Sequence, residues 1–161
     1  MPTKRNVFRV VASFNDAMGL ISPIIVQLKI LLQDICKANY HWDVKLDSEL
    51  TTRWMKLISE LGQVNVFQIP RRVTSKPDTK EFVYELEAFG DASSSAYAVV
   101  VYLVIKSRFS TPVRLIASKT CVAPLRKQTI PRLELLVGLI LARLTAWIKT
   151  TLEQCLVDRL K

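Results

Sequence analysis

The segment 82–105, FVYELEAFGDASSSAYAVVVYLVI, decides the fold of this chain. Its beginning, 82–89, alternates and is rich in aromatic side chains, which predicts a strand. The small residues at 90–95 interrupt it, and the apolar run at 96–105 is typical of a strand in the middle of a sheet. A hairpin loop then leads to a third predicted strand at 113–119. Short connections between consecutive strands predict an antiparallel meander.

The segment before the sheet is predicted to be helical. Apolar residues recur every three or four positions at 24–36, and Ser22-Pro23 is typical of a helix start, with Ser22 as the cap and Pro23 in the first turn. A second helix is predicted to begin after a cap at Asp47 or Ser48 and to end at Gly62.

After the sheet, a loop at 120–130 precedes a predicted helix from 131 to about 149. This helix is apolar all round, so we expect it to be buried on most sides. The fold class is therefore α+β, with an N-terminal helical segment (1–63), a basic linker (64–81) and a meander crossed by a helix (82–161).

The chain is basic, with 23 Lys and Arg against 14 Asp and Glu and a net charge of +9. A basic globular chain favours polyanionic partners, of which nucleic acid is the commonest. The three cysteines are far apart, which argues against a disulfide framework and a zinc site, and the single histidine, His41, argues against a Ser-His or Cys-His catalytic pair. Without a signal peptide or an apolar run of membrane-spanning length, we expect a soluble, cytoplasmic, non-secreted protein without membrane partners.

Two acidic residues stand among small or apolar neighbours. Asp91 follows the first predicted strand between Gly90 and Ala92, where a ligand can approach closely; the alternative is a turn aspartate bonded to its own backbone. Glu134 lies in the first turn of the apolar helix, where it is either paired or metal-bound, or faces water with support from the helix dipole. If the two converge, their oxygens suit Mg²⁺ or Mn²⁺ and two-metal phosphoryl transfer, although such sites usually use three or four carboxylates.

Short motifs follow one another along the chain. They are ASFNDAMGLISP at 12–23, Trp42-Asp43, Trp54, IPR at 69–71, FGDAS at 89–93, ASK at 117–119, VAPL at 122–125 and IPRLELL at 130–136. Together, over about residues 10–144, they resemble the BEL/Pao-type retrotransposon polyprotein where the end of the reverse transcriptase joins an RNase H-like domain. One departure is that the family's Asp-Pro-Leu-Gly stands here as Asp16-Ala17-Met18-Gly19.

The resemblance implies a two-metal RNase H that hydrolyses the RNA strand of RNA–DNA hybrids with Mg²⁺ or Mn²⁺. Asp91 and Glu134 would be its first two catalytic, metal-binding carboxylates. It also implies the remainder of the Pol polyprotein as a partner, and a location in the cytoplasm, in virus-like particles or in the nucleus. Basic residues that we expect to contact phosphates are Arg71, Arg72, Arg126, Lys127 and Arg132.

Two alternatives stay open. The family's third carboxylate belongs to an Asp-Ser pair on a later strand, whereas Asp158 is followed by Arg159, so we expect this chain to be an incomplete domain. Without that ligand it would be inactive in isolation, a truncated remnant that at most binds nucleic acid by charge. Regions of this kind are also catalogued as a Pao retrotransposon peptidase. An aspartic peptidase pairs two Asp-Thr/Ser-Gly loops, but Asp91-Ala92-Ser93 lacks the glycine, and a homodimer would have to supply the second loop.

Overall fold

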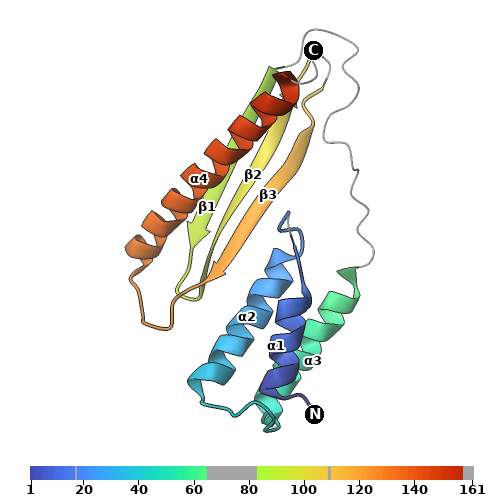
Figure 1. Cartoon of the computed structure of the whole chain (residues 1–161), viewed down its shortest axis with the longest axis vertical. Helices are drawn as coiled ribbons and strands as arrows, with labels where there is room; N and C mark the ends of the chain where they lie inside the picture. Colours follow the sequence, from blue (N-terminus) through green and yellow to red (C-terminus); the bar gives the residue numbers. More distant parts are fainter. Residues whose placement is uncertain (17, 65–82, 109, 158–161) are drawn as a thin grey trace.

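The computed structural model describes the chain except for residues 17, 65–82, 109 and 158–161. In the described part, three helices, a three-stranded sheet and a long final helix follow one another, which is the predicted α+β fold (Figure 1). The elements are α1 Lys4–Ser13, α2 Ser22–Lys37, α3 Ser48–Gly62, β1 Val83–Ala92, β2 Ala96–Lys106, β3 Val113–Val122 and α4 Ile130–Val157. The predicted linker falls almost wholly outside the described residues, so the division into domains stays a prediction.

The strands form the antiparallel meander that the sequence predicts, in the order β1-β2-β3. β1 pairs with β2 along its whole length, whereas a register shift between Val101 and Tyr102 interrupts the pairing of β2 with β3. β1 runs through Gly90 and Asp91, which we expected to lie in the break after the strand. Asp91 is therefore held within the sheet, opposite Ala98.

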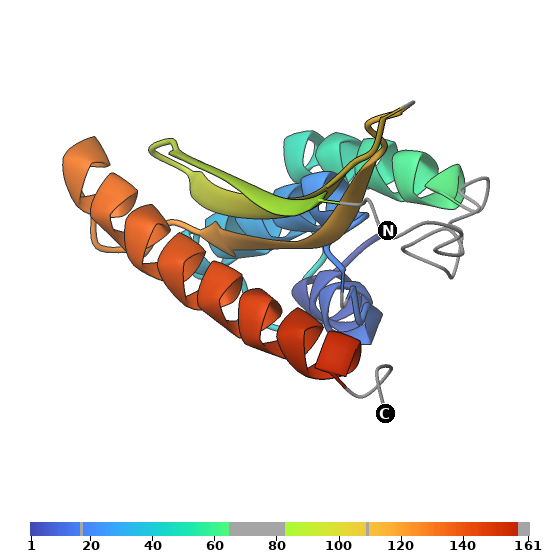
Figure 2. The same ribbon diagram turned by 90° about the horizontal axis from the view of Figure 1, so that it is seen from above.

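The helix α4 lies along one face of the sheet, against β1 and β2 (Figures 1 and 2). Because side chains alternate along a strand, β2 presents every second residue to this helix. The buried residues on this face of β2 are Val99, Val101, Leu103 and Ile105, and those of α4 are Leu133, Val137 and Ile148. Gly90 permits the close approach of the helix, because a Cβ there would collide with Cγ1 of Val137.

α4 differs from its prediction in length and in burial. It extends to Val157, beyond the expected end near residue 149, and its side away from the sheet is open to solvent. Leu135 is 76 % exposed and Trp147 is 64 % exposed. The expectation that this helix is buried on most sides was therefore wrong, because an apolar sequence does not itself provide a partner for every face.

By length and composition alone, Ile130–Gln154 within α4 is long and apolar enough to cross a membrane. It is the one such helix in the part of the chain that the structure describes. We expected no segment of that kind. A helix that packs on a sheet passes the same test, so the finding is weak evidence for a membrane span.

The three N-terminal helices enclose a core of their own (Figure 1). Its buried residues are Val7, Ile25, Leu28, Leu31, Ile35, Leu46, Leu50 and Trp54. Asp47 caps α3 as predicted, since its carboxylate accepts a hydrogen bond from the N–H of Leu50 at 2.8 Å. The expected cap at Ser22 is not formed, because Ser22 already belongs to α2. The carboxylate of Asp16 instead accepts hydrogen bonds from the backbone just before that helix.

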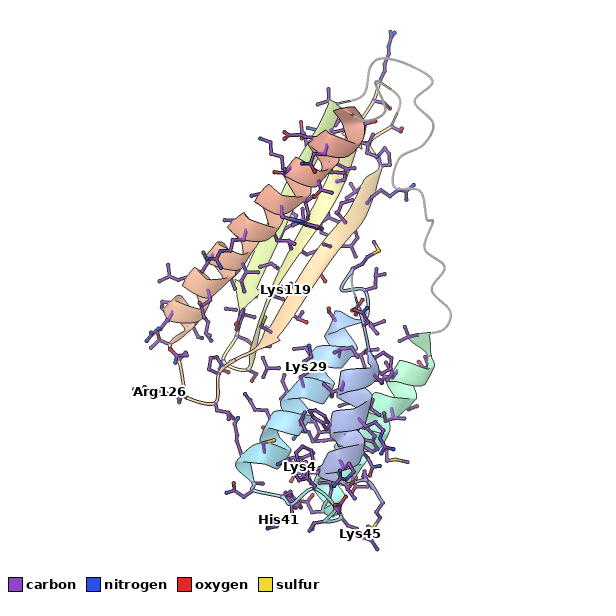
Figure 3. All side chains as sticks on the ribbon, viewed as in Figure 1. Lys4, Lys29, His41, Lys45, Lys119 and Arg126 are labelled. Atoms are coloured by element: carbon purple, nitrogen blue, oxygen red, sulfur yellow. The ribbon has the colours of Figure 1, made fainter. Side chains whose placement is uncertain are left out.

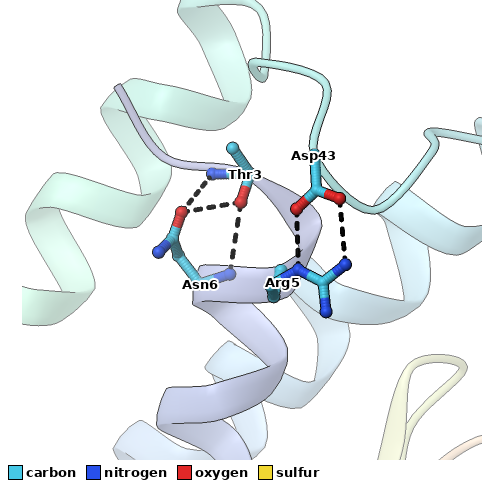
Figure 4. Close-up of polar contacts among 4 residues, drawn as sticks. All are labelled: Thr3, Arg5, Asn6 and Asp43. Atoms are coloured by element: carbon cyan, nitrogen blue, oxygen red, sulfur yellow. Dashed lines mark hydrogen bonds and ion pairs between the residues drawn. The ribbon is translucent and has the colours of Figure 1, made fainter.

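α1 is a helix that the sequence analysis did not predict. Thr3 and Asn6 form a capping box, in which each side chain accepts a hydrogen bond from the other residue's backbone N–H (Figure 4). Arg5 donates two hydrogen bonds, of 2.7 and 2.9 Å, to the carboxylate of Asp43 in the loop between α2 and α3 (Figure 4). These bonds fasten α1 to that loop and lower the pKa of Asp43 below its ordinary value.

Two sets of contacts join the helices to the sheet. Just before α2, Gly19 has a positive φ of 73° and lies against Ser118 of β3. The N–H of Ser118 donates to the carbonyl of Met18 at 2.8 Å, and its hydroxyl donates to the carbonyl of Gly19 at 2.9 Å. Near the other end of α2, Nε2 of Gln33 donates to the carbonyl of Ala123 at 2.7 Å. The helical segment and the sheet are thus hydrogen-bonded to each other at both ends of α2.

Candidate functional site

Asp91 is the second-last residue of β1, which is an outer strand of the described sheet. Its side chain is exposed, and Oδ1 accepts a hydrogen bond from the N–H of Ala92 at 2.8 Å. Within the described part of the chain, Oδ2 has no hydrogen-bond partner. The carboxylate is therefore oriented by its neighbour's backbone and still has lone pairs free for a ligand.

Glu134 is the fifth residue of α4, and its side chain is exposed. We had predicted it in the first turn of the helix. It lies just beyond that turn, because α4 begins at Ile130 rather than at Pro131. No hydrogen bond or ion pair holds its carboxylate among the residues that the structure describes. The helix thus presents an unpaired carboxylate near its N-terminal end.

The contact between Gly90 and Val137 relates the two carboxylates to each other. Asp91 follows Gly90 on β1, and Glu134 precedes Val137 on α4 by about one helical turn, so each carboxylate is close in sequence to this one contact between the two elements. Because adjacent strand residues point to opposite faces, Asp91 points away from the face that α4 covers. The outer edge of β1 therefore lies between the two carboxylates.

A complete metal site is not present within the described residues. They contain no group of three or more His, Cys, Asp or Glu side chains that could hold a metal ion. That Asp91 and Glu134 share one cation stays a prediction.

On the face of the sheet away from α4, Asp91 borders a hollow of about 680 Å³. The hollow lies between the sheet and the start of α2, and its apolar lining includes Phe89, Val100, Tyr102, Pro23 and Val26. The hydroxyls of Ser118 and Thr120 belong to the same lining. Of the lining residues that the structure describes, Asp91 alone carries a carboxylate, so an anionic group stands here beside an apolar surface.

The basic residues predicted to contact phosphates fall into two groups. Arg126 (Figure 3) and Lys127 lie in the loop before α4, and Arg132 lies in the first turn of α4. These three line a hollow of about 280 Å³ and have no ion-pair or hydrogen-bond partner for their side chains in the described part of the chain. Arg71 and Arg72 lie outside the described residues.

Lys37 and Arg53 were given no role by the sequence analysis. They line a second hollow, of about 500 Å³, together with Lys127. The sequence carries little signal for this neighbourhood, because the two residues belong to separate helices and meet Lys127 only through tertiary packing.

A meander crossed by a helix, with one carboxylate at the end of the first strand and another near the start of the helix, is the arrangement expected of an RNase H-like domain. A family model described as Pao retrotransposon-like RNaseH-like domain matches residues 3–159, and the chain belongs to this family. The match confirms the resemblance to a Pao-type retrotransposon fragment, and its description names an RNase H-like domain rather than a peptidase. Neither the comparison with curated proteins nor that with solved structures found a match.

Proposed function

We propose that this chain is part of a retrotransposon Pol polyprotein whose RNase H-like domain binds RNA–DNA hybrids and hydrolyses the RNA strand. Asp91 and Glu134 are the carboxylate ligands of a divalent cation, Mg²⁺ or Mn²⁺. The cationic side chains of Arg126, Lys127 and Arg132 contact phosphates of the hybrid. The domain works in the cytoplasm, where the rest of the polyprotein is its partner.

One observation carries this proposal. The packing of Val137 on Gly90 brings the end of β1 against the start of α4, and each of these ends bears an exposed carboxylate without a cationic partner in the described residues. An unpaired carboxylate on each of two packed elements is what a site for a cation and a polyanion requires.

The donor set fits a partial metal site. Asp91 and Glu134 supply hard oxygen ligands, and Mg²⁺ is usually held by one or two carboxylates together with waters and substrate phosphates. The two side chains therefore suffice for an ion that enters with nucleic acid. When bound, such an ion would activate a water and stabilise the leaving oxygen. The chain's own contribution is to orient Asp91 through Ala92 and to fix Glu134 on a packed helix.

A second candidate function is hybrid binding without cleavage. The small number of metal ligands favours this function, because no third acidic side chain among the described residues forms a cluster with Asp91 and Glu134. Loss of one ligand from so small a set is expected to cripple catalysis while leaving the phosphate contacts intact.

The test is a binding measurement on the full chain. Fluorescence anisotropy of a labelled RNA–DNA hybrid gives the Kd in Mg²⁺ and in EDTA. We expect Mg²⁺ to tighten binding, and we expect Asp91→Asn and Glu134→Gln each to abolish that gain. In EDTA neither variant should weaken binding, because each removes a negative charge that repels the phosphates. The loss should be about tenfold or more, because even partners that only orient a metal ligand contribute 10–100-fold.

Matched controls make the same change of charge elsewhere on the same elements. They are Glu87→Gln on β1 and Glu153→Gln on α4, both of exposed residues. If Asp91→Asn keeps the same Mg²⁺ gain as Glu87→Gln, the assignment of Asp91 is wrong. Gel analysis of the RNA strand then separates the two functions: cleavage that requires Glu134 supports hydrolysis, and intact RNA at saturating protein supports binding alone.

A further inference from the structure

We propose that the helical segment takes part in nucleic-acid binding, through Lys37 of α2 and Arg53 of α3. Together with Lys127 they bind successive phosphates of a strand that also passes Arg126 and Arg132. The inference rests on the proposed function, because it takes nucleic acid as the ligand. It deepens that function by extending the contact from the RNase H-like sheet and helix to the three N-terminal helices.

Two hollows meet at one basic residue. The hollow of about 280 Å³ at the start of α4 is lined by Arg126, Lys127, Gln128, Thr129 and Arg132. The hollow of about 500 Å³ is lined by Lys127 as well, and by residues of α2, α3, the turn between β1 and β2, and the loop after β3. Because Lys127 lines both, the two hollows adjoin at this residue, and we call them together the polar track.

The walls of the polar track are joined to one another by hydrogen bonds. Gln33 of α2 donates to the carbonyl of Ala123 at 2.7 Å, and the N–H of Ala123 donates to the carbonyl of Ser95 at 2.9 Å. The hydroxyl of Ser93 accepts from the N–H groups of Ser95 and Ala96, which fixes the turn between β1 and β2. The track therefore exists before any ligand arrives, and a ligand does not have to supply the free energy for ordering it.

The charges along the polar track suit an extended polyanion. One carboxylate, that of Asp34, lines the track. The cationic side chains that line it are those of Lys37, Arg53, Arg126, Lys127 and Arg132. They come from α2, α3, the loop before α4 and α4 itself, so a single small anion cannot reach them all. A nucleic-acid strand, which carries a charge at every phosphate, can.

Asp34 occupies the place that a phosphate would take. Its carboxylate lies 3.0 Å from Nη2 of Arg53 and 3.7 Å from Nζ of Lys37. All three side chains are at least one third exposed, and ion pairs between exposed groups contribute little and are screened by salt. A phosphate can therefore replace Asp34 at both cations without a large loss. Ser94 and Ser95, whose hydroxyls have no partner in the described part of the chain, add hydrogen-bond donors beside them.

The salt dependence of hybrid binding by the full chain tests this arrangement. Each phosphate contact contributes about 0.9 to the slope of log Kd against log salt concentration, which corresponds to about 3.5-fold in Kd between 50 and 200 mM salt. Lys37→Gln and Arg53→Gln should each reduce the salt effect by about that factor, as Lys127→Gln should. The matched control is Lys45→Gln, because Lys45 is exposed in the loop between α2 and α3 (Figure 3) and is not among the residues that line the track.

A variant that is expected to tighten binding distinguishes the loss of a phosphate contact from misfolding, because misfolding can only weaken binding. Asp34→Asn removes the carboxylate that competes with phosphate, so it should tighten hybrid binding, whereas Glu60→Gln, the same change on α3 outside the track, should not. If Asp34 only stabilises the helices, Asp34→Asn weakens binding or leaves it unchanged, and the proposal is overturned. Normal Mg²⁺-dependent binding with unaltered salt slopes in Lys37→Gln and Arg53→Gln overturns this inference alone. Absence of hybrid binding by the unmodified chain overturns the proposed function as well.

Discussion

The contact between β1 and α4 leads to a prediction about stability. Gly90→Ala adds a methyl group that collides with Cγ1 of Val137 and comes within 3.2 Å of Cγ1 of Val99. Both valines are buried, at 5 % and 2 % exposure, so neither side chain can turn into solvent. Overpacking of this kind costs about 1–3 kcal/mol of unfolding free energy. We expect Gly90→Ala to destabilise the chain by an amount in that range.

Val137→Ala removes the methyl group with which the new one collides. Alone it should cost about 2 kcal/mol, because two buried methyl groups are lost and a cavity remains. In the double variant the methyl added at position 90 enters the space vacated at 137. We therefore expect the double variant to be at least about 1 kcal/mol more stable than the sum of the two single costs, a coupling typical of residues in direct contact.

The coupling is measured by urea unfolding, followed by circular dichroism, of the unmodified chain, Gly90→Ala, Val137→Ala and the double variant. The control is Gly138→Ala, since a Cβ at that position meets nothing within 4 Å and alanine favours a helix interior by up to about 1 kcal/mol. It should stabilise the chain while Gly90→Ala destabilises it. Single costs that add to within about 0.5 kcal/mol would mean that the two positions do not touch, and would refute the packing of β1 on α4 described above.

Three further predictions concern the helical segment and α4. Asp47→Ala removes the cap of α3 and should lower the unfolding free energy by about 1 kcal/mol, with Ser48→Ala nearly neutral. Acid should weaken the segment, because hydrogen bonds from Arg5 and from the backbone of Leu50 lower the pKa values of Asp43 and Asp47 below the ordinary 3.8. That stabilisation is complete above pH 3.8 and is lost as the pH falls through the lowered values, so the urea midpoint should fall there, and less in an Asp43→Asn, Asp47→Asn variant. Leu28→Ala should cost about 2–5 kcal/mol, and Leu135→Ala within about 0.5 kcal/mol, as thermal unfolding would reveal.

The strands could be predicted from sequence because their signal is local. The apolar run of β2 and the alternation in β1 need no knowledge of distant residues, and short connections leave an antiparallel meander as the simple solution. α2 and α3 were found for the same reason, through spacing and the cap at Asp47. α1 was missed because its helix depends on a capping box and on Arg5 reaching Asp43, and the second of these is a tertiary contact.

The candidate site could be predicted residue by residue but not as an arrangement. The identities of Asp91 and Glu134 follow from motifs, whereas their relation depends on how Val137 meets Gly90 across two elements. Burial of α4 was misjudged because composition reports what a helix could bury and not what is available to cover it. Lys37 and Arg53 gave no signal, since their neighbourhood with Lys127 arises only when three elements pack.

The two hydrogen-bonded joints at the ends of α2 have a mechanical consequence. Ser118 holds the chain just before the helix, and Gln33 holds Ala123 near its end. If the helical segment and the sheet each move as a rigid body, two fixed points allow only a rotation about the line that joins those points. That line runs along α2, with the apolar hollow beside its start and the polar track beside its end. Any swing of the sheet against the helices would therefore change both openings in the same movement.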